Sequence, residues 1–94
     1  MRSLWSPEAE EALLAILIRL NAFSAGSGDR LAERVRRRVE ALERYPLMGR
    51  LVPEYGIAEI REVVEPPYRI FYEVFPDRVE VFAIRHGRER LPRE

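Results

Sequence analysis

The side chains best suited to chemistry in this sequence are basic and lie in its C-terminal part. They are Arg61, Arg69, Arg85, His86, Arg88 and Arg90. Histidine is the side chain whose ordinary pKa lies nearest to neutral pH, so His86 is the candidate for proton transfer. Guanidinium groups can hold a phosphodiester and stabilise the charge that develops on a transition state. If these residues converge, they suffice for metal-free cleavage of RNA, with the 2′-hydroxyl as the nucleophile.

Each of these residues also has a structural interpretation. A histidine at the end of a strand is more often a hydrogen-bonded structural residue than a catalyst. Arg61 and Arg69 can pair across strands with Glu62, Glu65 or Glu73, and exposed pairs of this kind contribute only about 0 to 1 kcal/mol. The sequence has no glycine-rich phosphate loop, nucleophile elbow or metal-ligand spacing. Any active site therefore depends on where the fold places the basic residues.

The composition predicts one small globular domain spanning residues 1–94. Hydrophobic residues make up 47% and charged residues 34%, and no apolar run reaches the roughly 18 to 20 residues needed to cross a bilayer. There is no cysteine and only one histidine, so we expect neither disulfides nor a metal cofactor. All basic residues are arginine and the formal net charge is zero, so binding to a polyanion requires local clustering of charge. The first apolar run follows glutamates rather than basic residues, so we expect a cytoplasmic protein without a signal peptide.

Two amphipathic helices are predicted in the N-terminal half. Ser6 and Pro7 suit the N-cap and the first position of the first helix. The apolar stripe of this helix is formed by Ala9, Leu13, Ile16, Leu17 and Leu20. Leu14 and Ile18 lie beside the stripe, where they form either the edge of a wide buried face or a surface for a partner.

The second helix is predicted over residues 30–45, with Asp29 as its cap and Pro46 after its end. Its buried stripe is formed by Leu31, Val35, Val39 and Leu42. The arginines at positions 36–38 have glutamates close by in the sequence. We therefore interpret them as part of a solvated face rather than as a nucleic-acid-binding helix.

An ordered loop over residues 47–57 is predicted to lead into three antiparallel strands. Residues 58–65, 68–75 and 78–85 are rich in β-branched and aromatic side chains and are separated by proline-containing turns. In the middle strand, Ile70, Tyr72 and Val74 share one face and Arg69, Phe71, Glu73 and Phe75 share the other. The last strand fits either a bulge near its centre or burial on both faces.

The residues near the N-terminus, around positions 2–5, can supply a fourth strand to this sheet. The predicted fold class is therefore α+β, with an N-terminal helical hairpin packed on a three- to four-stranded antiparallel β-sheet.

Four groups of motifs follow one another along the chain. They are WSPEAEE at residues 5–11, YPLMGR at 45–50, REVV at 61–64 with PYRIFY at 67–72, and HGR at 86–88. In order and spacing they resemble the RelE/ParE superfamily of toxins from bacterial and archaeal type II toxin–antitoxin modules, over nearly the whole length of the chain. The resemblance implies a helical hairpin against a four-stranded antiparallel sheet, and a cognate antitoxin that wraps and neutralises the toxin. It makes Leu14 and Ile18 candidates for antitoxin contact.

The resemblance implies one of two activities. RelE-like members cleave mRNA on the ribosome, whereas ParE-like members bind and poison DNA gyrase without a known hydrolytic site. In the RelE-like interpretation, His86 is the acid or base, and the scissile phosphate is surrounded by Arg61, Arg69 and Arg85. The same interpretation assigns RNA binding to Arg50, Arg88 and Arg90.

Other features of the sequence are closer to ParE-like proteins. The chain lacks lysines and the C-terminal tyrosine that some of the nucleases use, and HGR followed by Leu91 and Pro92 is more ParE-like. We favour the RNA-directed activity narrowly, because it gives the cluster of histidine and arginines a role. Gyrase poisoning is almost level with it, and a degenerate member that only binds antitoxin is the third possibility.

Overall fold

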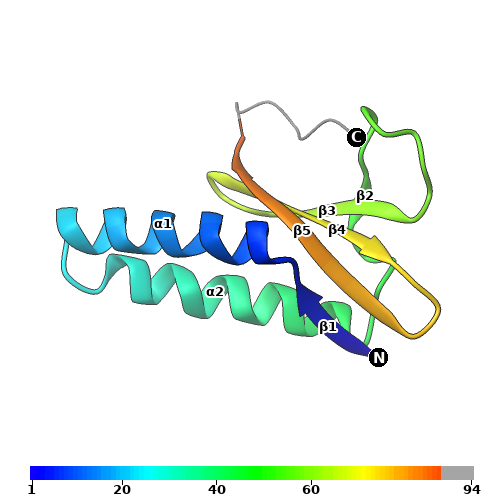
Figure 1. Cartoon of the computed structure of the whole chain (residues 1–94), viewed down its shortest axis with the longest axis horizontal. Helices are drawn as coiled ribbons and strands as arrows, with labels where there is room; N and C mark the ends of the chain where they lie inside the picture. Colours follow the sequence, from blue (N-terminus) through cyan, green and yellow to red (C-terminus); the bar gives the residue numbers. More distant parts are fainter. Residues whose placement is uncertain (88–94) are drawn as a thin grey trace.

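The computed structural model describes residues 1–87, which form a helical hairpin on one face of a five-stranded sheet (Figure 1). The helices are α1 (Pro7–Phe23) and α2 (Ser27–Leu42), and the strands are β1 (Arg2–Trp5), β2 (Arg50–Leu51), β3 (Ile60–Glu65), β4 (Tyr68–Val74) and β5 (Arg78–His86). The strand order is β1-β5-β4-β3-β2. All neighbours are antiparallel except β1, which pairs in parallel with β5. The α+β prediction is confirmed, with one more strand than expected.

Helix α1 begins as its sequence predicts. The Ser6 hydroxyl accepts a hydrogen bond of 3.1 Å from the backbone N–H of Ala9, and Pro7 occupies the first turn, where its missing N–H costs nothing. Ala9 and Ile16 are buried in the main core. The other three residues of the predicted stripe, Leu13, Leu17 and Leu20, are partly buried against that core. The stripe therefore fixes which side of α1 faces the sheet.

Helix α2 begins three residues earlier than predicted and ends three residues earlier, at Leu42. Its N-cap is Gly26, with a φ of 85° that favours glycine, rather than Asp29. Gly28 then lies so close to α1 that a Cβ atom would sit 2.3 Å from the carbonyl oxygen of Leu17. The close packing of the two helices therefore determines where α2 begins. A search of the sequence for capping side chains alone does not find this position.

The four predicted apolar positions of α2 are all buried, and much of its charge is paired. Arg36 and Arg37 contact Glu33 on the same helix, and these hydrogen bonds lower the pKa of Glu33 to about 2. Arg34 and Arg38 both bond to Glu65 at the end of β3, at 2.9 and 3.0 Å. These last two ion pairs fasten the helix to the sheet.

The sheet has a main core beneath the helices and a smaller one on its other face. Ile70 and Tyr72 of β4 belong to the main core, and Phe71 belongs to the smaller one, as the predicted alternation requires. In β5, Ala83 pairs with Phe71 and Val81 pairs with Tyr72, so that Phe82 is an extra residue between them. Both alternatives for this strand are therefore found: a bulge reverses its phase at the centre, and it has buried side chains on both faces of the sheet.

The segment between α2 and β3 is more structured than an ordered loop. It contains β2, which pairs with β3, and it carries Val52 and Tyr55 over the second face of the sheet. Tyr55 meets Phe82 edge to face, with ring centroids 5.9 Å apart. The three predicted strands are present as β3 to β5, with ends shifted by one or two residues. Within residues 1–87 no helix is both long and apolar enough to cross a membrane.

Candidate functional site

The four residues predicted to form a catalytic centre lie on opposite faces of the sheet. Arg69 and Arg85 are paired positions on β4 and β5, and Arg69 leans over the Phe71 ring on the face away from the helices. Arg61 is paired with Tyr72, and His86 with Tyr68, and both tyrosines belong to the core on the helical face. Directly paired residues share a face of the sheet. The structure therefore brings Arg69 and Arg85 together, but not with His86.

Arg61 and His86 share a face but are far apart along it. Their partners on β4 are Tyr72 and Tyr68, four residues apart, which corresponds to about 13 Å of strand. His86 is exposed at the end of β5, and its ring meets the Tyr68 ring edge to face with centroids 6.0 Å apart. Arg85 donates a hydrogen bond of 2.9 Å to the carbonyl of Ile84. Arg61 and His86 are therefore separated along the sheet, and the guanidinium group of Arg61 is engaged elsewhere.

Arg69 forms a two-point ion pair on the face of the sheet away from the helices, which we call the open face. Its Nε and Nη2 atoms each donate a hydrogen bond of 2.7 Å to one oxygen of Glu62, which is 1% exposed. The bonds from Arg69, helped by Arg50, hold the pKa of Glu62 below its ordinary value although burial acts in the opposite direction. The same pairing raises the pKa of Arg69. The charge of Arg69 is thus largely neutralised by a buried carboxylate, as in the structural interpretation of this residue.

Arg61 is engaged with the main chain rather than with a carboxylate. Its Nη1 atom donates to the carbonyl oxygens of Leu47 and Gly49, at 3.1 and 2.9 Å, and its Nε atom donates to that of Ala58 at 3.1 Å. All three acceptors belong to the segment between α2 and β3. The guanidinium group therefore holds this segment in place, a role that its sequence position beside β-branched residues does not suggest.

The three predicted RNA-binding arginines do not form one described surface. Arg50 is 66% exposed at its side chain and makes a contact of 3.4 Å with Glu62. Arg88 and Arg90 lie outside the described residues. Within residues 1–87 no three acidic, histidine or cysteine side chains are grouped so that they could hold a metal ion. The described part of the chain thus supplies one exposed member of this predicted set.

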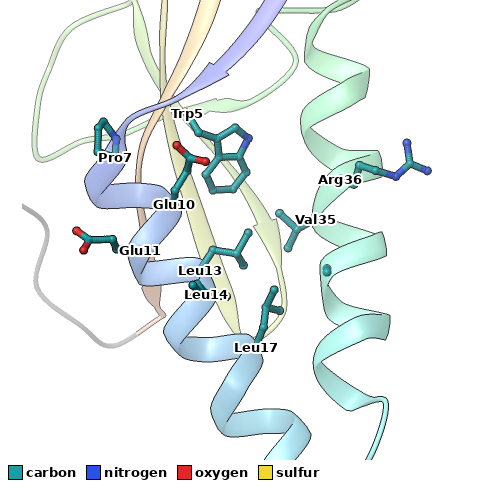
Figure 2. A pocket seen from close by; sticks show the side chains of 10 residues that line it. Trp5, Pro7, Glu10, Glu11, Leu13, Leu14, Leu17, Val35 and Arg36 are labelled. Atoms are coloured by element: carbon teal, nitrogen blue, oxygen red, sulfur yellow. The ribbon is translucent and has the colours of Figure 1, made fainter.

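A groove between α1 and α2 is lined mostly by apolar side chains. It has a volume of about 660 Å³ and is lined by Trp5, Pro7, Glu10, Glu11, Leu13, Leu14, Leu17, Ala32, Val35 and Arg36. Trp5, Leu13, Leu17 and Val35 point into the space between the helices, whereas Arg36 extends away from it (Figure 2). We call this hollow the interhelical groove.

The two predicted antitoxin-binding residues lie at or beside the interhelical groove. Leu14 lines it and is 57% exposed, and Ile18, one turn further along α1, is 62% exposed. Of the two alternatives for this row, an exposed surface is the one found. Trp5 was not predicted to belong to it, because its position depends on the parallel pairing of β1 with β5. The sequence feature that could have placed Trp5 at the groove is its position directly before Ser6, the N-cap of α1.

Comparisons with known proteins agree with this architecture. A family model described as ParE toxin of type II toxin–antitoxin system, parDE, matches residues 4–91. A relative from Caulobacter vibrioides, Toxin RelE2, is 37% identical over 84 residues, which cover 88% of this chain and 91% of that protein. A solved structure of the chromosomal ParDE toxin–antitoxin system from P. aeruginosa superposes with a TM-score of 0.75 at 17% identity, covering 92% of this chain and 95% of that one. The last likeness concerns the fold alone.

Proposed function

Because this chain belongs to the ParE toxin family of type II toxin–antitoxin systems, we propose that it arrests growth by binding and poisoning DNA gyrase. It does so without a hydrolytic site of its own. The observation that carries this proposal is the separation of the arginines and the histidine that a nuclease centre requires. The sequence alone favoured mRNA cleavage narrowly, and that preference depended on these residues meeting.

The hydrogen bonds of the arginines weigh against a role in cleavage. A group that stabilises charge on a transition state must be aimed at the reacting phosphate before the reaction. Arg69 is instead bonded through two nitrogens to buried Glu62, and Arg61 is bonded to three carbonyl oxygens. Breaking the Arg69–Glu62 pair to bind RNA would leave the buried carboxylate with only its 3.4 Å contact to Arg50, and removing a partner from a buried ion pair costs up to about 3 to 5 kcal/mol. Both arginines therefore support the fold more readily than they support catalysis.

A cognate antitoxin is the expected partner of a toxin in this family. We propose that it covers the interhelical groove, with Leu14 and Ile18 in the contact. The groove has an apolar floor and an acidic edge formed by Glu10 and Glu11 on α1. An antitoxin segment with apolar side chains along one side and basic residues beside them fits this pattern.

RelE-like cleavage of mRNA on the ribosome is the second candidate function. The relative at 37% identity is named Toxin RelE2, and Arg69 and Arg85 are neighbours on the open face of the sheet. In this alternative Arg85 and Arg50 hold RNA there. Arg88 and Arg90, which the sequence also assigns to RNA binding, lie outside the described residues. His86 would have to act from the other face, which is why we rank this activity second.

Two assays on the purified full-length protein separate these functions. One incubates it with gyrase, ATP and supercoiled DNA, and the other with ribosomes programmed with mRNA. We expect trapped gyrase cleavage complexes in the first assay and intact mRNA in the second. Site-specific mRNA cuts together with normal gyrase turnover would contradict the proposal and support the second candidate.

A further inference from the structure

The segment 44–51, which we call the display loop, exposes several large apolar side chains. Tyr45 and Leu47 are each 60% exposed, Leu51 is 54% exposed and Met48 is 51% exposed. Large apolar side chains that are grouped and exposed usually mark a contact surface. The loop follows α2 and ends with β2. It lies at the end of the molecule away from the turn between the two helices (Figure 1). It is therefore a different surface from the interhelical groove.

Buried Tyr72 fastens the display loop to the sheet. Its hydroxyl donates a hydrogen bond of 2.7 Å to the carbonyl of Pro46 and accepts one of 3.0 Å from the N–H of Gly49. Burial raises the pKa of Tyr72, so the hydroxyl keeps the proton that it donates. Gly49, within the loop, packs closely on the sheet, where a Cβ atom would sit 2.4 Å from the Tyr72 hydroxyl. Leu47 and Met48 are thus carried on a backbone that is fixed at both sides.

Arg61 holds the same backbone from the side of β3. Its bonds to the carbonyls of Leu47 and Gly49 flank Met48. Two side chains of the sheet, Tyr72 and Arg61, therefore make five hydrogen bonds to the loop and its continuation, while the loop leaves its apolar side chains in water. A loop fixed in advance loses little conformational entropy when it binds, which raises affinity.

The chemistry of the display loop indicates a protein partner with acidic groups around an apolar hollow. Residues 44–51 contain Arg44 and Arg50 and no acidic residue, so the loop is positive within a chain of zero formal charge. Tyrosine, methionine and arginine are enriched at the centres of protein–protein interfaces. Nucleic-acid interfaces are more polar and more positively charged than such surfaces. The apolar side chains favour a protein, and the two arginines select acidic surroundings.

We propose that this toxin binds gyrase through the display loop, and that Leu47 and Met48 enter an apolar hollow on gyrase that is surrounded by acidic residues. This assignment rests on the proposed function. Arg61 and Tyr72 are positioning residues that hold the loop in its binding shape. The toxin then meets gyrase with the display loop and meets its antitoxin with the interhelical groove.

The test compares full-length protein with the double variant Leu47→Ser/Met48→Ser and with the control Phe23→Ser. Phe23 is 85% exposed at the end of α1, so the control removes an exposed apolar side chain from a distant place. Binding to purified gyrase and trapped cleavage complexes on supercoiled plasmid are measured, with melting temperatures as the check on folding. We expect the double variant to bind gyrase about tenfold more weakly or worse, as for residues central to an interface. The control should match the unaltered protein.

Each outcome of this test is decisive. If the unaltered protein and the double variant both trap gyrase equally, the loop assignment is wrong and the proposed function stands. If the unaltered protein leaves gyrase untouched, both are overturned. If gyrase binding falls with Arg44→Ala/Arg50→Ala but not with the double variant, the loop binds through charge alone, and the proposed entry of Leu47 and Met48 into an apolar hollow is wrong.

Discussion

The interhelical groove and the display loop both present apolar side chains to water, but they hold them in different ways. In the groove, two helices position Leu13, Leu14 and Val35 through their own hydrogen bonds and through packing on the sheet. The display loop has only a two-residue strand, and side chains of β3 and β4 must fix its backbone. A helical surface is therefore robust to single changes, whereas a loop surface depends on a few distant residues.

Substitution of Gly49 by alanine should have the largest effect. The added Cβ would lie 2.4 Å from the Tyr72 hydroxyl and 2.7 Å from the carbonyl oxygen of Glu62, so the loop or the sheet must move. We expect a loss of about 3 kcal/mol in the free energy of unfolding, at the upper end of what overpacking costs, measured by urea denaturation. Gly56→Ala is the control, because a Cβ there meets no atom within 4 Å. Its φ of 63° should limit the loss to about 1 to 2 kcal/mol. Equal losses in the two variants would show that the close packing of Gly49 has no special role.

Substitution of Ile18 by glutamate should weaken binding of the antitoxin and leave the fold intact. Ile18 is exposed on α1, and a charge placed in an apolar contact would have to be desolvated. We expect antitoxin affinity to fall by about 10- to 100-fold, or roughly 1.4 to 2.7 kcal/mol, with gyrase poisoning retained. Titration with the protein encoded beside the toxin gene provides the measurement. An unfolded variant would show instead that Ile18 supports the core.

Replacing Tyr72 by phenylalanine should have a smaller effect on stability than Gly49→Ala. The ring still fills the core, but the buried N–H of Gly49 loses its acceptor and the carbonyl of Pro46 loses its donor. We expect a loss of about 1 to 2 kcal/mol in the free energy of unfolding and faster hydrogen exchange at the Gly49 amide. Protection that stays unchanged at that amide would mean that the hydroxyl does not fix the loop.

The smallest of these effects is expected for Arg61→Ala. Its hydrogen bonds to Leu47 and Ala58 are exposed, so stability should change by less than about 1 kcal/mol. Gyrase binding should fall by roughly three- to tenfold because the loop is less ordered, and Arg61→Lys should restore part of it by keeping a cation near the carbonyls. If Arg61→Ala abolishes mRNA cleavage by the protein instead, the residue belongs to a nuclease centre.

The sequence predicted the fold well because local patterns determine most of it. Helix periodicity identified four of the five buried residues of α2, all but Gly28. The Ser6 cap was found, and the mixed phase of β5 was matched by a bulge and by burial on both faces. The failure at the second cap has a physical cause. Gly26 and Gly28 start α2 through a positive φ and a close helix contact, and neither is visible as a capping side chain.

The candidate site was predicted less well, because it depends on how strands align with one another. The turn at Pro66 and Pro67 pairs Glu65 with Tyr68, and counting back from it places Arg61 opposite Tyr72 and Arg69 opposite Val64. Alternation then puts these two arginines on different faces. That signal was present in the sequence. The three carbonyls that Arg61 binds were not predictable, since they belong to a segment without periodicity.

The parallel edge strand β1 has a consequence for when the fold is completed. Residues 2–5 pair with residues 78–81, so β1 can pair only after the ribosome has also made β5. At an ordinary translation speed of about 5 to 20 residues per second, that wait lasts roughly 4 to 15 seconds. Contacts between such distant parts of a chain also form slowly. Each newly made molecule therefore passes through an interval in which Trp5 has no strand to hold it, and the sheet is completed only after β5 has been made.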